Sequence, residues 1–127
     1  MPPAQHRTDE APTSYTDVMT VSDTGRRTFF HQRGANALLE GGHIDLDGSP
    51  ARIFHLGYLL LLDRLDRIDA EGRTEASRLL EKARLHGFTT SLDLVSEDSD
   101  RFKQVALPSL PYVDVLVINE FEARKCT

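Results

Sequence analysis

The stretch EASRLLEKARLHGFTTSLDLV, residues 75–95, contains the two hydrophobic periods that decide the fold. Its first half carries small and apolar residues at the i, i+3, i+4 and i+7 spacing of an amphipathic helix: Ala76, Leu79, Leu80 and Ala83. Gly87 follows where a helix end favours a left-handed residue, and FTTSLDLV (88–95) then has the composition of a strand. A helix followed directly by an apolar strand predicts one repeat of an α/β structure.

The neighbouring sequence continues this alternation on both sides. ARIFHLGYL (51–59) and VDVLVI (113–118) are predicted to be buried strands. A short helix is expected to begin near Asp98, and another at Asn119. Continuous apolar strands that alternate with helices predict an α/β fold with a parallel sheet and right-handed crossovers.

The N-terminal third has a different character and divides the chain. Residues 1–13 are rich in proline and polar groups and are expected to form a flexible arm. SYTDVMTV and RRTFFHQ flank a turn at Gly25, which predicts a β-hairpin over 14–33. Residues 34–127 form the α/β part, in which LDRLDRIDAEG (62–72) is expected to cover the core as an exposed turn or helix.

Composition excludes several classes of function. The 127 residues carry a net charge of −5 without a basic cluster, which argues against nucleic-acid binding. The single cysteine, Cys126, cannot form an intrachain disulfide, so we expect a reducing, cytoplasmic location. The longest apolar stretch, around residues 59–62, is far shorter than the ~20 residues that span a bilayer, so no membrane partner is expected.

Three polar residues lie at or near the carboxyl ends of the predicted strands, where open α/β sheets bind ligands. They are His55, Asp93 and Asn119. Each also has a structural explanation: a buried histidine bonded to a backbone carbonyl, a turn-capping aspartate, and a helix N-cap that forms a capping box with Glu122. The residues alone leave both interpretations open.

Four segments give the chain a family resemblance. In order they are GRRTFFHQRGANALL (25–39), RIFHLGYLLLL (52–62), TTSLDLVSEDSDRF (89–102) and LPYVDVLVINEFEA (110–123). In this order they resemble the middle of a PfkB-family, ribokinase-like carbohydrate kinase. The resemblance implies a three-layer α/β/α core, of which this chain has part, with the hairpin belonging to a small β lid. It also implies ATP-dependent phosphorylation of a sugar or nucleoside hydroxyl.

The resemblance assigns roles to individual residues. Asn119 and Glu122 match the family's N-x-x-E motif, which helps place the nucleotide phosphates and Mg²⁺, the ion being held by Glu122 through water. The residues that match positions near the substrate are Gly34, Ala35, Asn36 and Asp93. The chain departs from the family at Asp93-Leu94-Val95, where many members have Asp-x-Asn, and at Gly57, where some carry an acidic residue that contacts the sugar.

Two family motifs are not found in the 127 residues. These are the N-terminal Gly-Gly segment with its sugar-binding residues, and the Asp-Thr-x-Gly-Ala-Gly-Asp stretch that carries the catalytic base. We therefore expect an internal segment of a kinase without a catalytic residue and inactive alone. The alternative is a non-catalytic binding or assembly module, or a truncated gene product, that forms a homodimer through the lid hairpin.

Overall fold

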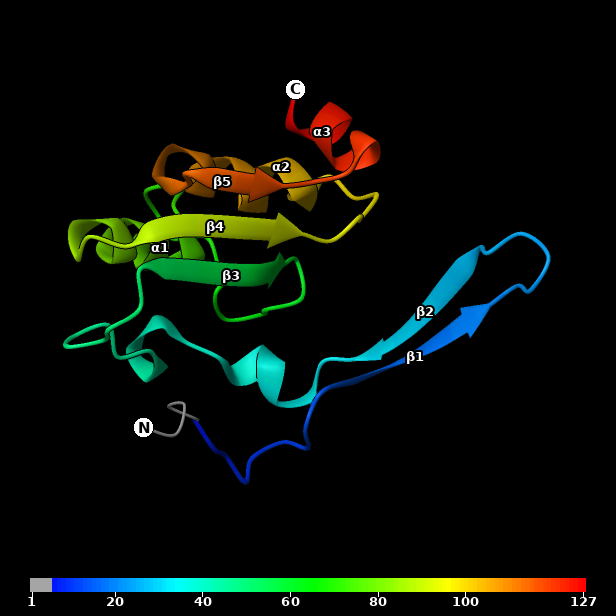
Figure 1. Cartoon of the computed structure of the whole chain (residues 1–127), viewed down its shortest axis with the longest axis horizontal. Helices are drawn as coiled ribbons and strands as arrows, with labels where there is room; N and C mark the ends of the chain where they lie inside the picture. Colours follow the sequence, from blue (N-terminus) through cyan, green and yellow to red (C-terminus); the bar gives the residue numbers. More distant parts are fainter. Residues whose placement is uncertain (1–5) are drawn as a thin grey trace.

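A three-stranded parallel sheet forms the centre of the computed structural model, which describes residues 6–127 (Figure 1). Its strands lie in the order β3 (Ile53–Leu59), β4 (Thr89–Leu94) and β5 (Val115–Val117). The predicted α/β fold with a parallel sheet is thereby confirmed. In the observed register His55 lies opposite Ser91, and Asp93 lies opposite Val117.

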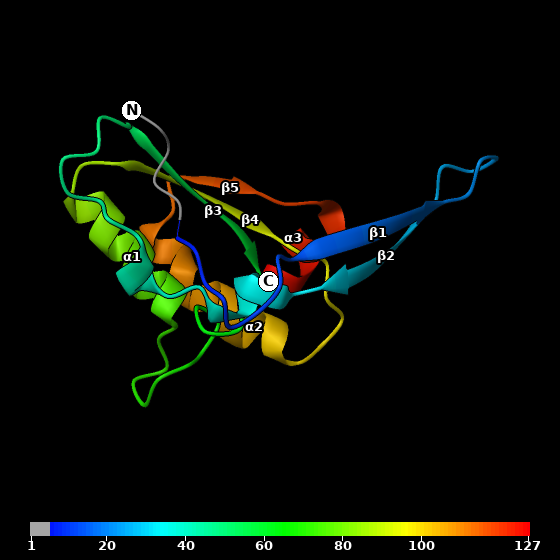
Figure 2. The same ribbon diagram turned by 90° about the horizontal axis from the view of Figure 1, so that it is seen from below.

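The helices pack on one face of this sheet. Figure 2 shows α1 (Glu75–Leu85) and α2 (Arg101–Ala106) both below the strands, and α1 lies against the 3₁₀ helix that follows α2. The Thr74 side chain caps α1 by accepting a hydrogen bond from the backbone N–H of Ser77 at 3.1 Å. The predicted apolar stripe of α1 lies in the core with the inner residues of the strands, and its buried members are Ala76, Leu79, Leu80 and Ala83.

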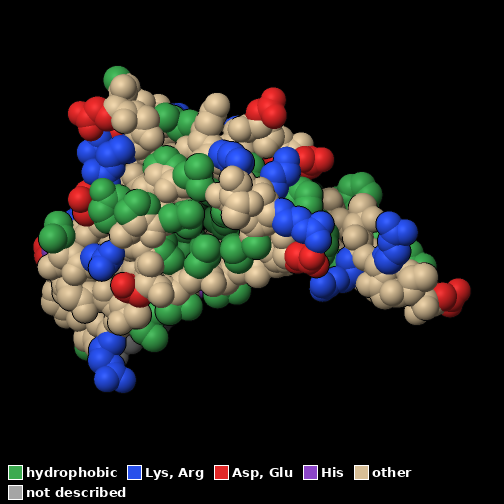
Figure 3. All heavy atoms as spheres, turned by 90° about the horizontal axis from the view of Figure 1, so that it is seen from above, with side chains coloured by type: hydrophobic (Ala, Val, Ile, Leu, Met, Phe, Trp, Pro, Cys, Tyr) green, Lys and Arg blue, Asp and Glu red, His purple; other side chains and the backbone are tan. Residues whose placement is uncertain are grey.

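The two strands predicted to be buried, β3 and β5, are largely exposed, whereas β4 is mostly buried. Ile53 in β3 is 63% exposed, and Val115 and Val117 in β5 are each 49% exposed. The reason is that the helices cover only one face, while β4 is also flanked by a strand on each side. Figure 3 views the molecule from the β5 side and shows hydrophobic side chains gathered across the middle of this side. β5 is therefore an apolar edge strand in the described part of the chain.

Two other local predictions need correction. The helix expected to begin near Asp98 begins at Arg101 and continues as the 3₁₀ helix η3 (Leu107–Tyr112), which accommodates two prolines. Residues 62–72 form turns, one of the two alternatives expected, but the segment is not exposed throughout, because Leu65 is completely buried. Asp66 is also buried, at 5% exposed, because its carboxylate accepts hydrogen bonds from the backbone N–H groups of Leu60 and Leu62.

The hairpin was predicted correctly and projects from the rest of the molecule (Figures 1 and 2). It consists of β1 (Tyr15–Thr20) and β2 (Arg27–Gln32), paired antiparallel. The two short 3₁₀ helices η1 (Gly34–Leu38) and η2 (Gly41–His43) lead from it to the sheet.

The predicted arm, residues 1–13, is described only in part, since 1–5 lie outside the described residues. Its last residues cross the base of the hairpin, where the Pro12 carbonyl accepts a hydrogen bond from the Ala35 N–H at 2.8 Å. Gly34 has a φ of +48°, and a Cβ there would lie 2.3 Å from the Pro12 oxygen. Glycine is thus required at the crossing. None of the helices in residues 6–127 is long and apolar enough to cross a membrane.

Candidate functional site

The predicted capping box at the start of α3 (Glu120–Cys126) is present and forms the most strongly connected polar cluster beyond the strand ends. The Asn119 side-chain oxygen accepts from the Glu122 N–H at 3.0 Å, and Glu122 Oε2 accepts from the Asn119 N–H at 2.9 Å. Glu122 Oε1 also accepts from Asn119 Nδ2 at 3.0 Å. The local signal for a helix start is therefore confirmed in full.

Ser96 joins this capping box to the segment that follows β4. Its hydroxyl donates to Glu122 Oε1 at 2.6 Å and accepts from Asn119 Nδ2 at 2.8 Å. Sequence reasoning did not select Ser96, although its place three residues after Asp93, just past a strand end, was an available signal. We call Ser96, Asn119 and Glu122 the capping cluster. It ties the carboxyl ends of β4 and β5 together.

Burial limits what the Glu122 carboxylate can bind. Glu122 is only 4% exposed, and its Oε1 already accepts two hydrogen bonds. Oε2 accepts one, which leaves a single acceptor direction, because a carboxylate oxygen can accept two. This donor set fits a magnesium ion held through one bridging water, since Mg²⁺ tends to keep several of its waters. It does not fit an ion bound by both carboxylate oxygens.

Glu97, the residue that follows Ser96, forms an ion pair with Arg101. Arg101 at the start of α2 donates from Nε to Glu97 Oε1 at 2.8 Å and from Nη2 to Oε2 at 3.0 Å. This charge-assisted bonding is the main reason that the pKa of Glu97 is lowered below its usual range. Arg101 also donates to the Leu60 carbonyl at 2.8 Å, so it connects the loop after β3 to the segment after β4.

His55 and Asp93 lie on the face of the sheet opposite the helices. His55 Nδ1 is 3.0 Å from the Ser91 hydroxyl, so its partner is a side chain rather than the backbone carbonyl that we considered. Gly57 separates His55 from Asp93: a Cβ at residue 57 would lie 3.3 Å from His55 Nε2 and 3.4 Å from the Asp93 Cβ. The missing side chain leaves a small gap between a ring nitrogen and an aspartate at the end of β4.

The predicted site residues thus form three groups. His55 and Asp93 flank Gly57, while Asn119 and Glu122 lie in the capping cluster. Gly34, Ala35 and Asn36 lie in η1 at the base of the hairpin, where the neighbouring Arg33 forms an ion pair with Asp63 in the loop after β3. Within residues 6–127, no hydrogen bond or ion pair joins the three groups directly.

The described region contains no large cluster of metal-binding side chains. Nowhere in residues 6–127 do three or more histidine, cysteine, aspartate or glutamate side chains gather in a way that could hold a metal ion. Any magnesium at the capping cluster would therefore take most of its ligands from water rather than from protein side chains.

Comparison with protein-family models, with curated proteins and with solved structures finds no match for this chain.

Proposed function

We propose that this chain is a segment of a PfkB-family carbohydrate kinase, with a ribokinase-like core and a β lid. The whole protein would transfer the γ-phosphate of ATP to a hydroxyl of a sugar or nucleoside. The four ordered segments that resemble the family support the proposal, as does the order of a hairpin followed by a parallel α/β unit. The proposal places the catalytic base outside these 127 residues.

The observation that carries the proposal is the position of the capping cluster. Ser96 and Asn119 follow two neighbouring parallel strands, at the sheet edge where ligands of open α/β folds bind. Phosphoryl transfer depends on positioning and charge neutralisation, which a polar cluster at a helix start can provide. In the proposed site, Asn119 orients the phosphates and Glu122 holds a water of the magnesium ion, while Asp93 lies on the substrate side together with Gly34, Ala35 and Asn36.

An NMR titration of the ¹⁵N-labelled chain with ATP and magnesium tests this site. We expect the amide signals of residues 93–97 and 119–123 to shift together as a single saturable process. The Gly25 amide, at the far turn of the hairpin, serves as the internal control and should not move. If ATP binding saturates, as judged from shifts of other amide signals, while the signals of residues 119–123 do not move, the assignment of the phosphate site is overturned.

The hairpin favours a second candidate function, a module that assembles with its own copy. It exposes large apolar side chains on both faces: Tyr15, Met19 and Phe30 on one face, Val18 and Phe29 on the other, each 45–63% exposed. Solvated apolar surface of this kind commonly marks an interface. Exposed strand edges on both β1 and β2 offer further pairing positions.

Sedimentation velocity tests the assembly function directly. We expect the wild-type chain to dimerise and Phe29→Ser/Phe30→Ser to remain monomeric. Leu85→Ser is the matched control, because Leu85 is 82% exposed on α1, away from the hairpin. A wild-type chain that stays monomeric at high concentration would rule out this function.

A further inference from the structure

A surface hollow of about 470 Å³ lies on the outer side of α1, apart from every residue of the candidate site. One wall is the helix face that bears Glu75, Leu79 and Lys82. The other two walls are Gly41–Gly42 and the loop Arg67–Asp69. We call this hollow the α1 pocket. Its volume lies in the range of small-molecule sites.

The floor of the α1 pocket is apolar. Glu75, Leu79 and Lys82 stand at i, i+4 and i+7, so they share one face of the helix. Leu79 is 3% exposed, and Ile68 across from it is 44% exposed. A Cβ at Gly41 would lie 3.9 Å from Leu79 and 3.5 Å from Glu75 Oε1, so glycine at this position keeps the wall clear of side-chain atoms.

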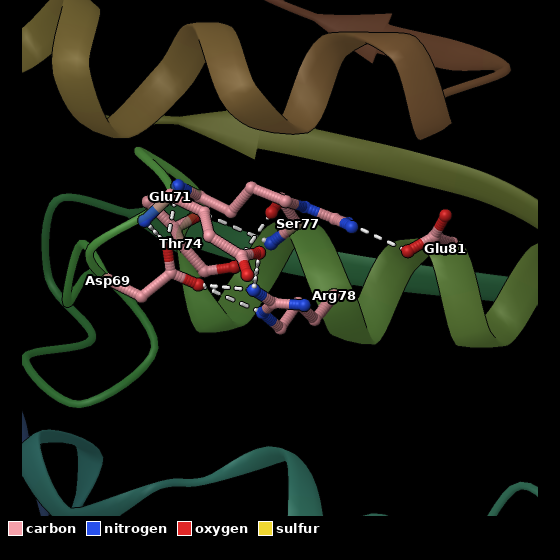
Figure 4. A network of polar contacts seen from close by, with 7 residues as sticks. Asp69, Glu71, Thr74, Ser77, Arg78 and Glu81 are labelled. Atoms are coloured by element: carbon pink, nitrogen blue, oxygen red, sulfur yellow. Dashed lines mark hydrogen bonds and ion pairs between the residues drawn. The ribbon is translucent and has the colours of Figure 1, made fainter.

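The acidic groups of the α1 pocket are already bonded within the protein. Asp69 Oδ2 accepts from Arg78 Nε at 3.0 Å and from its Nη2 at 2.5 Å, while Oδ1 accepts from the N–H groups of Glu71 and Arg73 at 2.9 Å each. Figure 4 shows Asp69 and Glu71 both pointing at Arg78. Glu75 Oε1 accepts from the Gly41 N–H at 2.9 Å.

The same bonding neutralises Arg78. Its guanidinium also donates to Glu71 Oε2 at 2.8 Å, so two carboxylates surround it. The hydrogen bond from Arg78 is the main cause of a lowered pKa at Asp69, which therefore stays ionised near neutral pH. Arg78 therefore has no free positive charge to offer an anion, and its guanidinium occupies one oxygen of each of the two carboxylates.

Two positive charges of the α1 pocket remain without a partner. Within residues 6–127, neither Arg67 nor Lys82 forms an ion pair. They come from opposite walls, Arg67 from the loop and Lys82 from the helix. Charge-assisted hydrogen bonds from arginine and lysine are strongest toward phosphate and carboxylate.

We propose that the α1 pocket binds a small organic anion, a phosphate monoester or carboxylate that carries a compact apolar group. The anionic head lies between Arg67 and Lys82, and the apolar group rests on Leu79 and Ile68. An anion is favoured because Asp69 and Glu75 are already hydrogen-bonded within the protein, and because Arg67 and Lys82 outnumber Glu75, the one carboxylate of the pocket that forms no ion pair in residues 6–127. The proposal does not depend on the kinase assignment, since the two sites share no residue.

An NMR titration of the ¹⁵N-labelled chain with phenyl phosphate and, separately, with benzoate tests the proposal. We expect saturable shifts at the amides of Gly41, Gly42 and residues 67–69 with at least one of the two probes. The absence of saturable shifts at these amides with both probes would overturn the site. Inorganic phosphate is the third arm, and binding as tight as that of phenyl phosphate would overturn the role of the apolar floor.

Charge variants separate specific binding from general attraction to a basic surface. Arg67→Gln/Lys82→Gln should weaken phenyl phosphate binding about tenfold. The control is Arg52→Gln/Lys103→Gln, which also removes one exposed arginine and one exposed lysine that form no ion pair in the described residues. The affinity of this variant for phenyl phosphate should stay unchanged. Equal weakening in both double variants would contradict the proposal.

A third variant blocks the space without removing charge. Gly41→Val adds a side chain against Leu79 and should abolish binding while both cations remain. Unchanged binding by a folded Gly41→Val chain would show that the probe binds elsewhere. Its far-UV circular dichroism spectrum establishes that the variant is folded.

Discussion

Replacement of Glu122 tests how far the capping cluster holds the ends of β4 and β5 together. Glu122→Ala removes the acceptor of three hydrogen bonds, from Ser96 Oγ, Asn119 Nδ2 and the Asn119 N–H. At about 1 kcal/mol for each bond, the free energy of unfolding should fall by about 3 kcal/mol. The 4% exposure of Glu122 limits how well water can replace the lost partner.

Glu122→Gln should cost much less. Glutamine keeps an oxygen for the Asn119 N–H, as capping boxes with glutamine do, but turns an NH₂ group toward Asn119 Nδ2. The expected loss is about 1 kcal/mol. Glu120→Gln is the control in the same helical turn, because the Glu120 side chain is 81% exposed and its ion pair with Arg124 contributes at most about 0.5 kcal/mol.

Urea denaturation followed by circular dichroism measures these differences, and amide hydrogen exchange at Asn119 reports the capping bond itself. Protection of the Asn119 amide should be lost in Glu122→Ala and largely kept in Glu122→Gln. In a double-mutant cycle, Ser96→Ala should couple to Glu122→Ala by about 1 kcal/mol. Equal stability of Glu122→Ala and Glu120→Gln, with the Asn119 amide still protected, would refute this account of the cluster.

Two further predictions concern the segments around the site. In Gly34→Ala the Ala35 amide should lose its protection from hydrogen exchange, because the new Cβ meets the Pro12 oxygen. The control Gly25→Ala has a φ of +67° and no atom within 4 Å, so its free energy of unfolding should fall by only about 1 kcal/mol. Equal effects of the two variants would contradict the close contact between Gly34 and Pro12. Burial is the main reason that the pKa of Asp66 is raised in the folded protein. The protein is therefore most stable at a pH below the ordinary pKa of aspartate, where Asp66 is protonated in both the folded and the unfolded state. It loses stability as the pH rises through the higher pKa of the folded state. Wild type should therefore lose stability relative to Asp66→Asn between acidic and neutral pH in urea titrations, and the opposite slope would refute this assignment.

Local periodicity predicted the elements that local forces determine. The α1 helix, its C-terminal end at Gly87 and the hairpin followed from spacing and turn residues, and the capping box followed from Asn119 and Glu122. The order of strands and helices also predicted a parallel sheet, because continuous apolar strands joined by helices have few other arrangements.

Tertiary packing decided the features that the sequence did not predict. Apolar residues in β5 indicated burial, but exposure depends on which faces other elements cover. Asp66 looked like one more exposed charge in an alternating segment, yet the two N–H groups of the loop after β3 bind it inside the protein. Ser96 joined the candidate site only because β4 and β5 are neighbours, a contact that spans 23 residues of sequence from Asn119.

Magnesium dependence of ATP binding tests the proposed phosphate site most directly. Isothermal titration calorimetry would give the Kd of ATP for the wild-type chain and for Glu122→Gln, each with magnesium and with a chelator. The proposal predicts that magnesium tightens binding to the wild-type chain about tenfold, or about 1.4 kcal/mol, and that the variant loses this gain. A gain of the same size in Glu122→Gln would contradict a role for Glu122 beyond capping α3.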